Sequence, residues 1–359
     1  MNLLVGQISA RDIMEYSCAR RASDIHLAPM SPLMIRVDGE LVPASDHSLS
    51  PEETEQVARS IMDDKQWEEL EKMGELDFAY SFPGFSRVRV NTFKQRGTYG
   101  IALRILSVEV PAPEQLGLPR AVVDLTRKKR GLVLVTGATG SGKSTTLASL
   151  INIISENYAK NIITLEDPIE YLHKHKRSIV NQREVGLDTQ SYANALRAAL
   201  RQDPDVILVG EMRDLDTISI AITAAETGHL VFSTLHTNST ADAIDRMIDV
   251  FPPHQQQQIR VQLASVIEGV VAQQLLPKVD GGRIAAFEVL LANPAIRNLI
   301  REGKAFQIPS VLQTGKKEGM QTMDDTIYKI LMQNIITRDT AIQFALDQNT
   351  MISKTSMFY

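Results

Sequence analysis

Sulfur ligands and aromatic rings are scarce in this sequence. Cys18 is the only cysteine among 359 residues, and aromatic residues make up 5% of the chain. A single cysteine excludes an intramolecular disulfide, and a thiolate zinc cage would need ligands that the chain lacks. Few aromatic side chains also mean few stacking platforms for the bases of a single-stranded nucleic acid.

Long apolar runs and an excess of positive charge are missing as well. The strongest apolar run, LVLVT at 132–136, is far shorter than the roughly 18 residues of a membrane-spanning helix. The amino terminus has no basic leader before an apolar core, so it is a poor secretion signal. The net charge of -5 argues against a broadly basic nucleic-acid binder. We therefore expect a soluble, cytoplasmic protein without direct membrane insertion, which reaches the inner face of a membrane only through partners.

The length of the chain and a cluster of prolines predict two domains. A chain of 359 residues exceeds one comfortable hydrophobic core. Prolines 111, 113 and 119 each fix φ and remove a backbone donor, so residues 107–119 are predicted to be an extended linker. The prediction thus divides the chain into an amino-terminal domain at 1–106, this linker, and a second domain at 120–359.

The residues before the linker predict a small α+β domain. An S-x-x-E capping box at the start and Gly74 at the end predict one helix over residues 50–73. A strand pair is expected to turn at Asp38–Gly39. Two further alternating strands, SRVRVNTF and YGIALRIL, would place Arg89 and Arg104 on the face away from the core.

The residues after the linker alternate in the manner of a parallel α/β sheet. Four short apolar runs, LVLVT, IITLE, VILVG and LVFST, are separated by longer segments of helical pattern. Continuous apolar strands separated by helices indicate a parallel sheet that is covered on both faces. From residue 254 onward the pattern is interpreted as mostly helical.

The run VTGATGSGKSTT carries the clearest chemical signal. It follows an apolar run and opens a segment with one apolar helical face, as the phosphate-binding motif G-x-x-x-x-G-K-[ST] requires. Its glycines permit a loop whose backbone N–H groups converge on a phosphate at a helix N-terminus. The predicted nucleotide-binding residues are Gly137, Ala138, Thr139, Gly140, Ser141, Gly142, Lys143, Ser144 and Thr145. Lys143 would reach the β- and γ-phosphates of ATP, and Ser144 would be a ligand of Mg²⁺. The alternative, a glycine-rich turn that binds nothing, is disfavoured by the complete motif.

Two acidic strand ends indicate a reaction at the predicted phosphate site. Glu211 comes directly after the run VILVG, where it would hold Mg²⁺ or position the attacking water. Glu166 ends the run IITLE, with Asp167 and Glu170 close by, and one of these carboxylates would serve as general base for water. Two acidic strand ends around one phosphate site favour hydrolysis over nucleotide storage.

Histidines and arginines complete the set of candidate catalytic residues. His229 and His236 flank the run LVFST, and an imidazole near the γ-phosphate would report whether that phosphate is present. A purely structural role is the alternative for both. Arg89 and Arg104 are either solvated strand residues or bidentate phosphate ligands, supplied within one subunit or by a neighbour.

Taken together, these motifs resemble those of the secretion-type ATPases of the type II secretion and type IV pilus superfamily, over nearly the whole chain. ASDIHL at 22–27 resembles the amino-domain signature of that family, and TLEDPIEY resembles its Asp box. DPDVILVGEMRD resembles its Walker B motif, and TGHLVFSTLHTNS its His box. The resemblance implies a PAS-like α+β amino-terminal domain linked to a RecA-like P-loop ATPase domain with a helical carboxyl-terminal part, assembled as a homo-hexamer.

The resemblance also implies roles for single residues. Glu166 would be the catalytic glutamate, and Glu211 the acid on the Mg²⁺ side. The two histidines named above would be those of the His box. Arg89 and Arg104 fall where the amino domain of the family supplies arginines to the nucleotide, in the same subunit or in its neighbour.

The segment NPAIRNLIREGK at 293–304 resembles an element of the retraction ATPases within this family. Its residues predict a helix that Asn293 caps and Gly303 ends. Arg297 and Arg301 lie one turn apart, and their mutual repulsion fits either an acidic partner or a solvated face. The four-cysteine insertion and the long amino-terminal region usual in extension and general secretion members are missing, which favours retraction.

The expected function is ATP hydrolysis that drives pilus depolymerisation and twitching motility. The resemblance implies an inner-membrane pilus platform protein as partner, together with an accessory retraction ATPase. An accessory retraction paralogue is the nearest alternative identity. A RecA-like translocase on nucleic acid is another, but the basic runs RKKR at 127–130 and HKHKR at 173–177 lack interleaved aromatics and are interpreted as solvated faces. A regulator without hydrolysis would not need the acidic strand ends.

Overall fold

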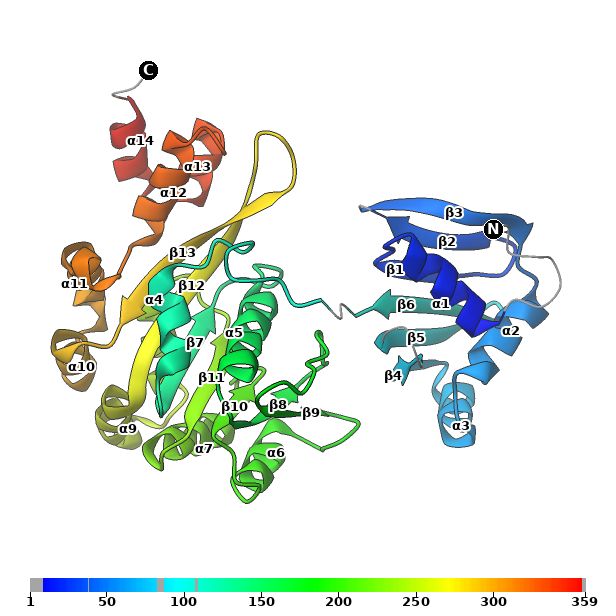
Figure 1. The fold of residues 1–359 in the computed structure, drawn as a ribbon, viewed down its shortest axis with the longest axis horizontal. Coiled ribbons are helices and arrows are strands. Elements are labelled where there is room, and N and C mark those ends of the chain that lie inside the picture. Colours follow the sequence, from blue (N-terminus) through cyan, green and yellow to red (C-terminus); the bar gives the residue numbers. More distant parts are fainter. Residues whose placement is uncertain (1–8, 38, 83–86, 107–108, 357–359) are drawn as a thin grey trace. The chain divides into compact units, whose positions relative to one another are not determined.

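The computed structural model describes two compact units, each with its own sheet and core (Figure 1). The described residues are 9–37, 39–82, 87–106 and 109–356. The first unit consists of residues 1–109 with 170–172, and the second of residues 110–169 with 173–359.

The described part of the first unit is a six-stranded antiparallel sheet with three helices. Its strands follow the order β3-β2-β1-β6-β5-β4. Apolar residues on one face of this sheet share a core with Ile13 and Met14 of α1 and Val57 of α2. The elements are α1 (Ala10–Ala19), β1 (Asp24–Leu27), β2 (Pro32–Val37), β3 (Glu40–Ser48), α2 (Pro51–Ser60), α3 (Asp64–Met73), β4 (Glu75–Ser81), β5 (Arg87–Gln95) and β6 (Thr98–Ile105).

The single helix predicted over residues 50–73 is wrong, because two helices form there. Ser50 caps α2 through the predicted capping box. Asp63 starts α3 with a second capping box, in which its carboxylate accepts from the N–H of Gln66. Gly74 ends α3 in the left-handed conformation, with φ of 87°, as predicted. A second start signal within an apolar periodic stretch therefore divides the helix. In the predicted turn between β2 and β3, Asp38 lies outside the described residues.

The second unit is a seven-stranded sheet with helices on both faces. Its strands follow the order β13-β12-β7-β11-β10-β8-β9, and all neighbours except β12 and β13 are parallel. The predicted parallel sheet is confirmed. The strands are β7 (Gly131–Thr136), β8 (Asn161–Glu166), β9 (Ile179–Glu184), β10 (Val206–Val209), β11 (Leu230–Leu235), β12 (Ile267–Pro277) and β13 (Arg283–Leu291). The helices are α4 (Arg120–Asp124), α5 (Lys143–Asn157), α6 (Tyr192–Ala199), α7 (Leu215–Glu226), α8 (Thr240–Asp249), α9 (Pro253–Val266), α10 (Pro294–Arg301), α11 (Ile308–Thr314), α12 (Met323–Met332), α13 (Arg338–Phe344) and α14 (Gln348–Ser356).

Residues of the central strand β7 face two different cores in alternation. Leu132 and Leu134 pack in the core that includes residues of α6, α7, α8 and α9. Val133 and Val135 pack in the core on the other face, which includes residues of α4 and α5 (Figure 1). Burial of both faces explains why these strands are continuous apolar runs in the sequence.

The chain from residue 254 onward is mostly helical, as predicted, but the prediction missed β12 and β13, which form a long antiparallel hairpin there. The hairpin turns at Gly281 and Gly282, which have φ of 86° and 72°. Two β-rich runs around a Gly-Gly pair are a hairpin signal. Ala272 and Leu276 of this hairpin share a further core with α12, α13 and α14. None of the helices within the described ranges is long and apolar enough to cross a membrane.

A buried carboxylate joins this hairpin to two helices. Glu288 of β13 is 5% exposed, and its Oε1 accepts from the N–H of Thr240 at 2.8 Å and from its hydroxyl at 2.7 Å. Oε2 accepts from the N–H of Met323 at 3.3 Å. Thr240 and Met323 are the first residues of α8 and α12, where backbone N–H groups lack partners within the helix. One carboxylate therefore caps both helices.

Candidate active site

The phosphate loop connects the end of β7 to the start of α5. Three of its glycines have positive φ, 148° at Gly137, 77° at Gly140 and 90° at Gly142, a conformation that other residues rarely adopt. Because α5 begins at Lys143, the loop lies at the N-terminus of a 15-residue helix, whose dipole favours an anion. The strand–loop–helix setting that the motif requires is therefore present.

The ammonium group of Lys143 is held against the loop. The side chain is buried, and Nζ donates to the carbonyl oxygens of Gly137 at 2.8 Å and Ala138 at 3.0 Å. These bonds fix a positive charge beside the loop. Ser144 and Thr145 follow in the first turn of α5, and both are partly exposed. The loop thus combines a fixed cation, a helix N-terminus and two accessible hydroxyl-bearing residues.

Glu166 is the last residue of β8, and two neighbours orient its carboxylate. Oε1 accepts from the hydroxyl of Thr164 at 2.6 Å and from Nε2 of Gln182 at 3.0 Å. Thr164 precedes Glu166 by two positions, so both lie on the same side of the strand. Gln182 comes from the neighbouring strand β9. A charged acceptor with two donors on one oxygen is held in one orientation.

Glu211 lies two residues beyond β10 and is paired with two cations or potential cations. Its Oε1 is 2.7 Å from Nε of Arg213, and its Oε2 is 3.4 Å from Nε2 of His236. His236 directly follows β11. Because β7, β8, β10 and β11 are parallel, their carboxyl ends meet at one edge of the sheet. The structure therefore brings Glu166, Glu211 and His236 to the edge that carries the phosphate loop.

A pair of threonines connects the phosphate loop to the His box. Thr136, the last residue of β7, lies with its hydroxyl 2.8 Å from the hydroxyl of Thr237. The same oxygen accepts from the N–H of Thr237 at 2.8 Å. Thr136 directly precedes Gly137, and Thr237 directly follows His236. A displacement of either loop would therefore be transmitted to the other.

His229 is not brought to the phosphate loop of its own subunit. It precedes β11 whereas His236 follows it, and six strand residues span about 20 Å. Its Nδ1 lies 2.9 Å from the carbonyl oxygen of Ala224, and its own carbonyl accepts from the N–H of Gly131, where β7 begins. The two histidines thus lie at opposite edges of the sheet.

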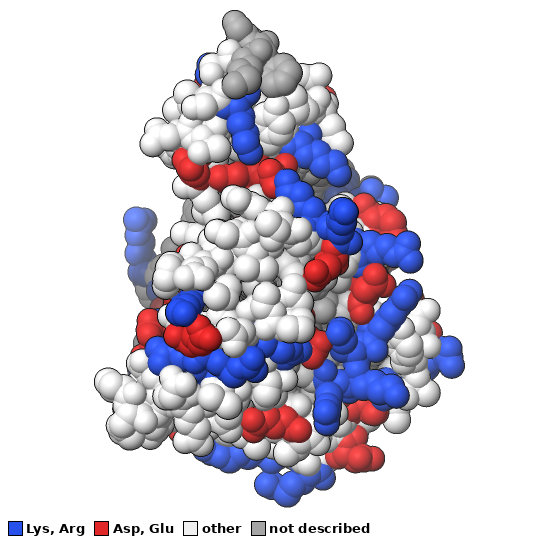
Figure 2. All heavy atoms as spheres, turned by 90° about the vertical axis from the view of Figure 1, so that its left-hand side faces the viewer, with Lys and Arg blue, Asp and Glu red and all other residues white. Residues whose placement is uncertain are grey.

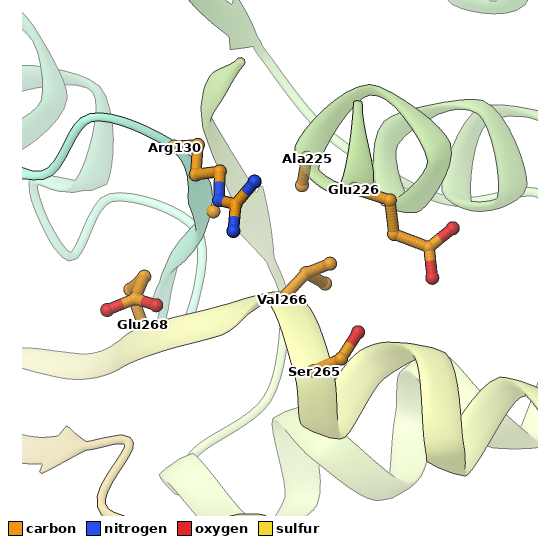
Figure 3. A pocket seen from close by; sticks show the side chains of 7 residues that line it. Arg130, Ala225, Glu226, Ser265, Val266 and Glu268 are labelled. Atoms are coloured by element: carbon orange, nitrogen blue, oxygen red, sulfur yellow. The ribbon is translucent and has the colours of Figure 1, made fainter. Parts of the chain in front are cut away.

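A pocket of about 280 Å³ lies at this opposite edge (Figure 3). Figure 3 labels one arginine, Arg130, and two glutamates, Glu226 and Glu268, around it. Glu268 is paired with Lys128 at 2.8 Å and with Arg297 at 2.9 Å. The mixed charge of this lining does not resemble a phosphate site, and the glutamates would repel an anion.

Arg89 and Arg104 are direct cross-strand neighbours on β5 and β6, and both are exposed. Nε of Arg104 donates to Oδ1 of Asp24 at 2.8 Å, and Nε of Arg89 lies 4.0 Å from Oδ1 of Asp77. Burial alone would raise the pKa of Asp24, but hydrogen bonds from Arg104 and Ser23 outweigh it and lower that pKa. The structure brings the two arginines to each other on the first unit.

Tyr192, at the start of α6, is a neighbour of the acidic strand ends that the sequence did not single out. Its hydroxyl would lie 2.7 Å from a Cβ placed on Gly210, so it occupies the space beside that glycine. It lines a pocket of about 600 Å³ together with Asp167 and Glu211. Burial, and then the charges of Asp167, Glu211 and Glu166, raise the pKa of the phenol, which stays protonated at neutral pH.

The helix predicted between Asn293 and Gly303 forms as α10 (Pro294–Arg301), with Asn293 accepting from the N–H of Ile296 at 3.0 Å. Arg297 donates to the carbonyl oxygen of Ala264 at 2.7 Å, near the end of α9, and pairs with Glu268. The charge of Arg297 is therefore paired within its own subunit. Of the two arginines in this segment, Arg301 is the exposed one.

The two basic runs are largely paired with acidic or main-chain acceptors. Lys128 pairs with Glu268, and Lys176 pairs with Glu156. His173 adds no positive charge to its run at neutral pH, because burial, and then the charge of Lys176, lowers its pKa to about 4. Figure 2 shows positive side chains interleaved with negative ones on the visible face. This pairing matches the interpretation of the runs as solvated faces.

Comparison with known proteins gives a consistent set of relatives. The family described as "Type II/IV secretion system protein" matches residues 5–343. The type IV pilus retraction ATPase PilT of Pseudomonas aeruginosa is 46% identical over 330 residues, which cover 92% of this chain and 96% of that protein. The twitching motility protein of Neisseria gonorrhoeae is 47% identical over 319 residues, or 89% of this chain and 85% of that one.

Two solved structures resemble nearly all of the chain. The crystal structure of the pilus retraction motor PilT with bound ADP matches with a TM-score of 0.90 and 50% identity, and covers 96% of this chain and 99% of that one. The ATPase DotB of Legionella pneumophila matches with a TM-score of 0.80 and 29% identity, over 96% and 94%. These matches confirm the predicted α/β fold class, with an amino-terminal domain followed by a RecA-like ATPase domain.

Proposed function

The chain belongs to the family of type II/IV secretion system proteins, and from this membership and the geometry of the site we propose that it is the ATP-hydrolysing motor of type IV pilus retraction. One observation carries the proposal. A complete phosphate loop lies at the same sheet edge as Glu166, Glu211 and His236. Relatives named for pilus retraction and for twitching motility support the choice of retraction over extension.

We propose that ATP binds with its phosphates in the loop formed by residues 137–142, against Lys143 and the N-terminus of α5. Hydroxyl and carboxylate oxygens are the ligands that Mg²⁺ prefers. Ser144 and Glu211 offer one of each, and the remaining ligands would be phosphate and water oxygens. Ser144 and Glu211 would hold the ion, which would neutralise charge on the phosphates, and Glu211 would give up part of its pairing with Arg213 to bind it.

We propose that Glu166 is the general base for the attacking water. A base must be oriented as well as charged, and the bonds from Thr164 and Gln182 supply that orientation. His236 would sense the γ-phosphate, since it contacts Glu211 and directly precedes the threonine that bonds to the end of β7. His229 would act either on a nucleotide bound by another subunit, or indirectly, through β11, on the nucleotide of its own subunit.

Assembly and motion follow from the same proposal. We propose a homo-hexamer in which Arg89 and Arg104 of the PAS-like domain, residues 1–106, reach a nucleotide of the same or the neighbouring subunit. The segment 107–119 would act as the hinge to the ATPase domain at 120–359, because residues between elements absorb large rotations. Cycles of hydrolysis would then act on a platform protein of the inner membrane, at its cytoplasmic face. An accessory retraction ATPase would assist.

The biochemical test uses the purified full chain with ATP and magnesium. Release of inorganic phosphate and a hexameric mass in analytical ultracentrifugation are expected. A monomer that releases no phosphate would end the proposal. Stimulation of turnover by DNA, with salt-sensitive DNA binding, would instead support a translocase on nucleic acid.

The genetic test separates retraction from extension. A deletion strain should carry excess surface pili and lose twitching motility, because pilin would still polymerise but not depolymerise. A strain without pili would mean extension. Complementation with Lys143→Ala should fail to restore motility, whereas wild-type protein at the same level should restore it.

A further inference from the structure

Gln273 lies against the phosphate loop, although a long stretch of the sequence separates the two. It belongs to β12, which pairs with β7 in parallel register, Ala272 opposite Thr136. The side chain is 4% exposed, and Oε1 accepts from the hydroxyl of Thr146 at 2.7 Å. Thr146 lies in the first turn of α5, so Gln273 connects β12 to the helix that the loop opens.

The same residue touches the loop at its first and last glycine. A Cβ on Gly137 would lie 2.3 Å from the carbonyl oxygen of Gln273, and a Cβ on Gly142 would lie 2.8 Å from its Nε2. Both distances are shorter than any Cβ contact tolerates. The main chain and the side chain of Gln273 therefore fill the space that these two glycines leave open.

The amide group has the polarity that this place requires. Its carbonyl end accepts from Thr146, which leaves the Nε2 end facing Gly142 at the N-terminus of α5. Amide hydrogens carry partial positive charge, which suits a site for phosphate. A carboxylate of the same size would still accept from Thr146, but it would place a negative charge beside the bound phosphates.

We propose that Gln273 is a positioning residue for the phosphate loop, which fixes the loop from β12 in the shape that holds a triphosphate. The inference rests on the proposed function, because it presumes that a nucleotide occupies the loop. Gln273 acts through Gly137, Gly142 and Thr146 rather than on the reacting atoms. Its effect should therefore appear first in nucleotide affinity.

The chain offers a matched control in the next residue. Gln274 follows Gln273 in β12, and successive side chains of a strand point to opposite faces. Gln274 is half-buried and faces away from the loop. The same substitution at the two positions therefore changes net charge and composition equally, but differs in its proximity to the phosphate loop and in burial. Thermal unfolding, measured for each variant, reports the effect of the difference in burial.

The experiment compares Gln273→Glu, Gln273→Met and Gln274→Glu in the full chain. Binding of a fluorescent ATP analogue, the KM and kcat of hydrolysis, and thermal unfolding are measured for each. Gln273→Glu should weaken nucleotide binding about tenfold or more, the effect of a nearby like charge, and KM should rise with it. Gln273→Met should weaken binding by about threefold to tenfold through loss of the bond to Thr146. Gln274→Glu should bind as the wild type does.

The outcomes separate this inference from the proposed function. Wild-type protein that binds no nucleotide would end the proposed function itself. Wild-type binding with unchanged affinity in both Gln273 variants would overturn the positioning role alone. If Gln273→Glu does not fold, Gln273→Met decides, and a lower melting temperature at normal affinity would assign Gln273 a merely structural role. A comparable loss of affinity in Gln274→Glu would also overturn the inference, because the effect would not depend on the loop.

Discussion

Removal of the hydroxyl of Thr164 should slow ATP hydrolysis without weakening nucleotide binding. Thr164 is fully buried in β8, and its hydroxyl donates to Oε1 of Glu166 at 2.6 Å. The substitution Thr164→Val keeps the shape of the side chain and removes only this donor. The second donor, Gln182, stays in place at 3.0 Å. The carboxylate should therefore remain in the site, but with a wider range of orientations.

The expected fall in kcat of Thr164→Val follows from the strength of one hydrogen bond to a charged acceptor. Such a hydrogen bond contributes about 1.5–3 kcal/mol. If about half of that value is lost from the transition state, kcat falls by about fourfold to tenfold, since each 1.36 kcal/mol corresponds to a factor of ten. Glu166→Gln removes the base entirely and should lower kcat by about 100-fold to 10,000-fold. The dissociation constant for ATP should stay near the wild-type value in both variants.

The assay is steady-state phosphate release, combined with binding of a fluorescent ATP analogue. Ser233→Ala is the matched control, because Ser233 is also fully buried, but its hydroxyl donates to the carbonyl oxygen of Val209 at 2.7 Å and not to a carboxylate. It should lower stability by about 1 kcal/mol and leave kcat unchanged. Undiminished hydrolysis by Glu166→Gln would refute the assignment of the base. An unchanged kcat in Thr164→Val would refute the need for orientation.

Three further predictions concern the loop, the hairpin and the response to acid. Lys143→Ala should abolish binding of the fluorescent nucleotide or its hydrolysis, and normal values for both would contradict its role at the phosphates. Glu288→Gln should lower the free energy of unfolding by about 2–3 kcal/mol in denaturant titrations, because a neutral amide is a weaker cap for α8 and α12 and presents donors to donors; a change below about 0.5 kcal/mol would contradict this, within the error of such measurements. The pKa of His173 is lowered from 6.5 to about 4, so the folded state keeps it neutral while the unfolded chain binds a proton as pH falls. Stability should thus drop by about 2 kcal/mol between about pH 7 and pH 5, and His173→Phe should flatten this dependence, whereas an unchanged pH profile would refute the contribution.

The parts of the site that the sequence predicted are those encoded locally. The phosphate loop is a contiguous motif in which each glycine has a conformational reason, so strand, loop and helix follow from one stretch of chain. Glu166 and Glu211 were found because each ends an apolar run, and parallel strands bring such ends together. The sequence also allows Thr164 to be predicted as a neighbour of Glu166, since it lies two positions before Glu166 and a strand repeats every two residues.

Other partners were missed because their strands were missed. Gln182 lies on β9, an edge strand with polar residues, and Gln273 lies on a hairpin within a stretch whose overall pattern predicts mostly helix. Their contacts join segments far apart in sequence, for which a single sequence holds no spacing rule. His229 shows a different error. A position next to a strand does not place a residue at the site, because the two ends of a six-residue strand lie at opposite edges of the sheet.

The place of β7 in the sheet has a consequence for how the protein is made. β7 lies between β11 and β12, both of which leave the ribosome long after it. A nascent chain that ends before Ile267 already contains the whole GKST motif, yet it lacks β12, the strand that packs against the phosphate loop. Such a truncated chain should expose the backbone edge of β7 that pairs with β12, and it should therefore be a target for chaperones. It should acquire affinity for nucleotide only when the hairpin of β12 and β13 has emerged.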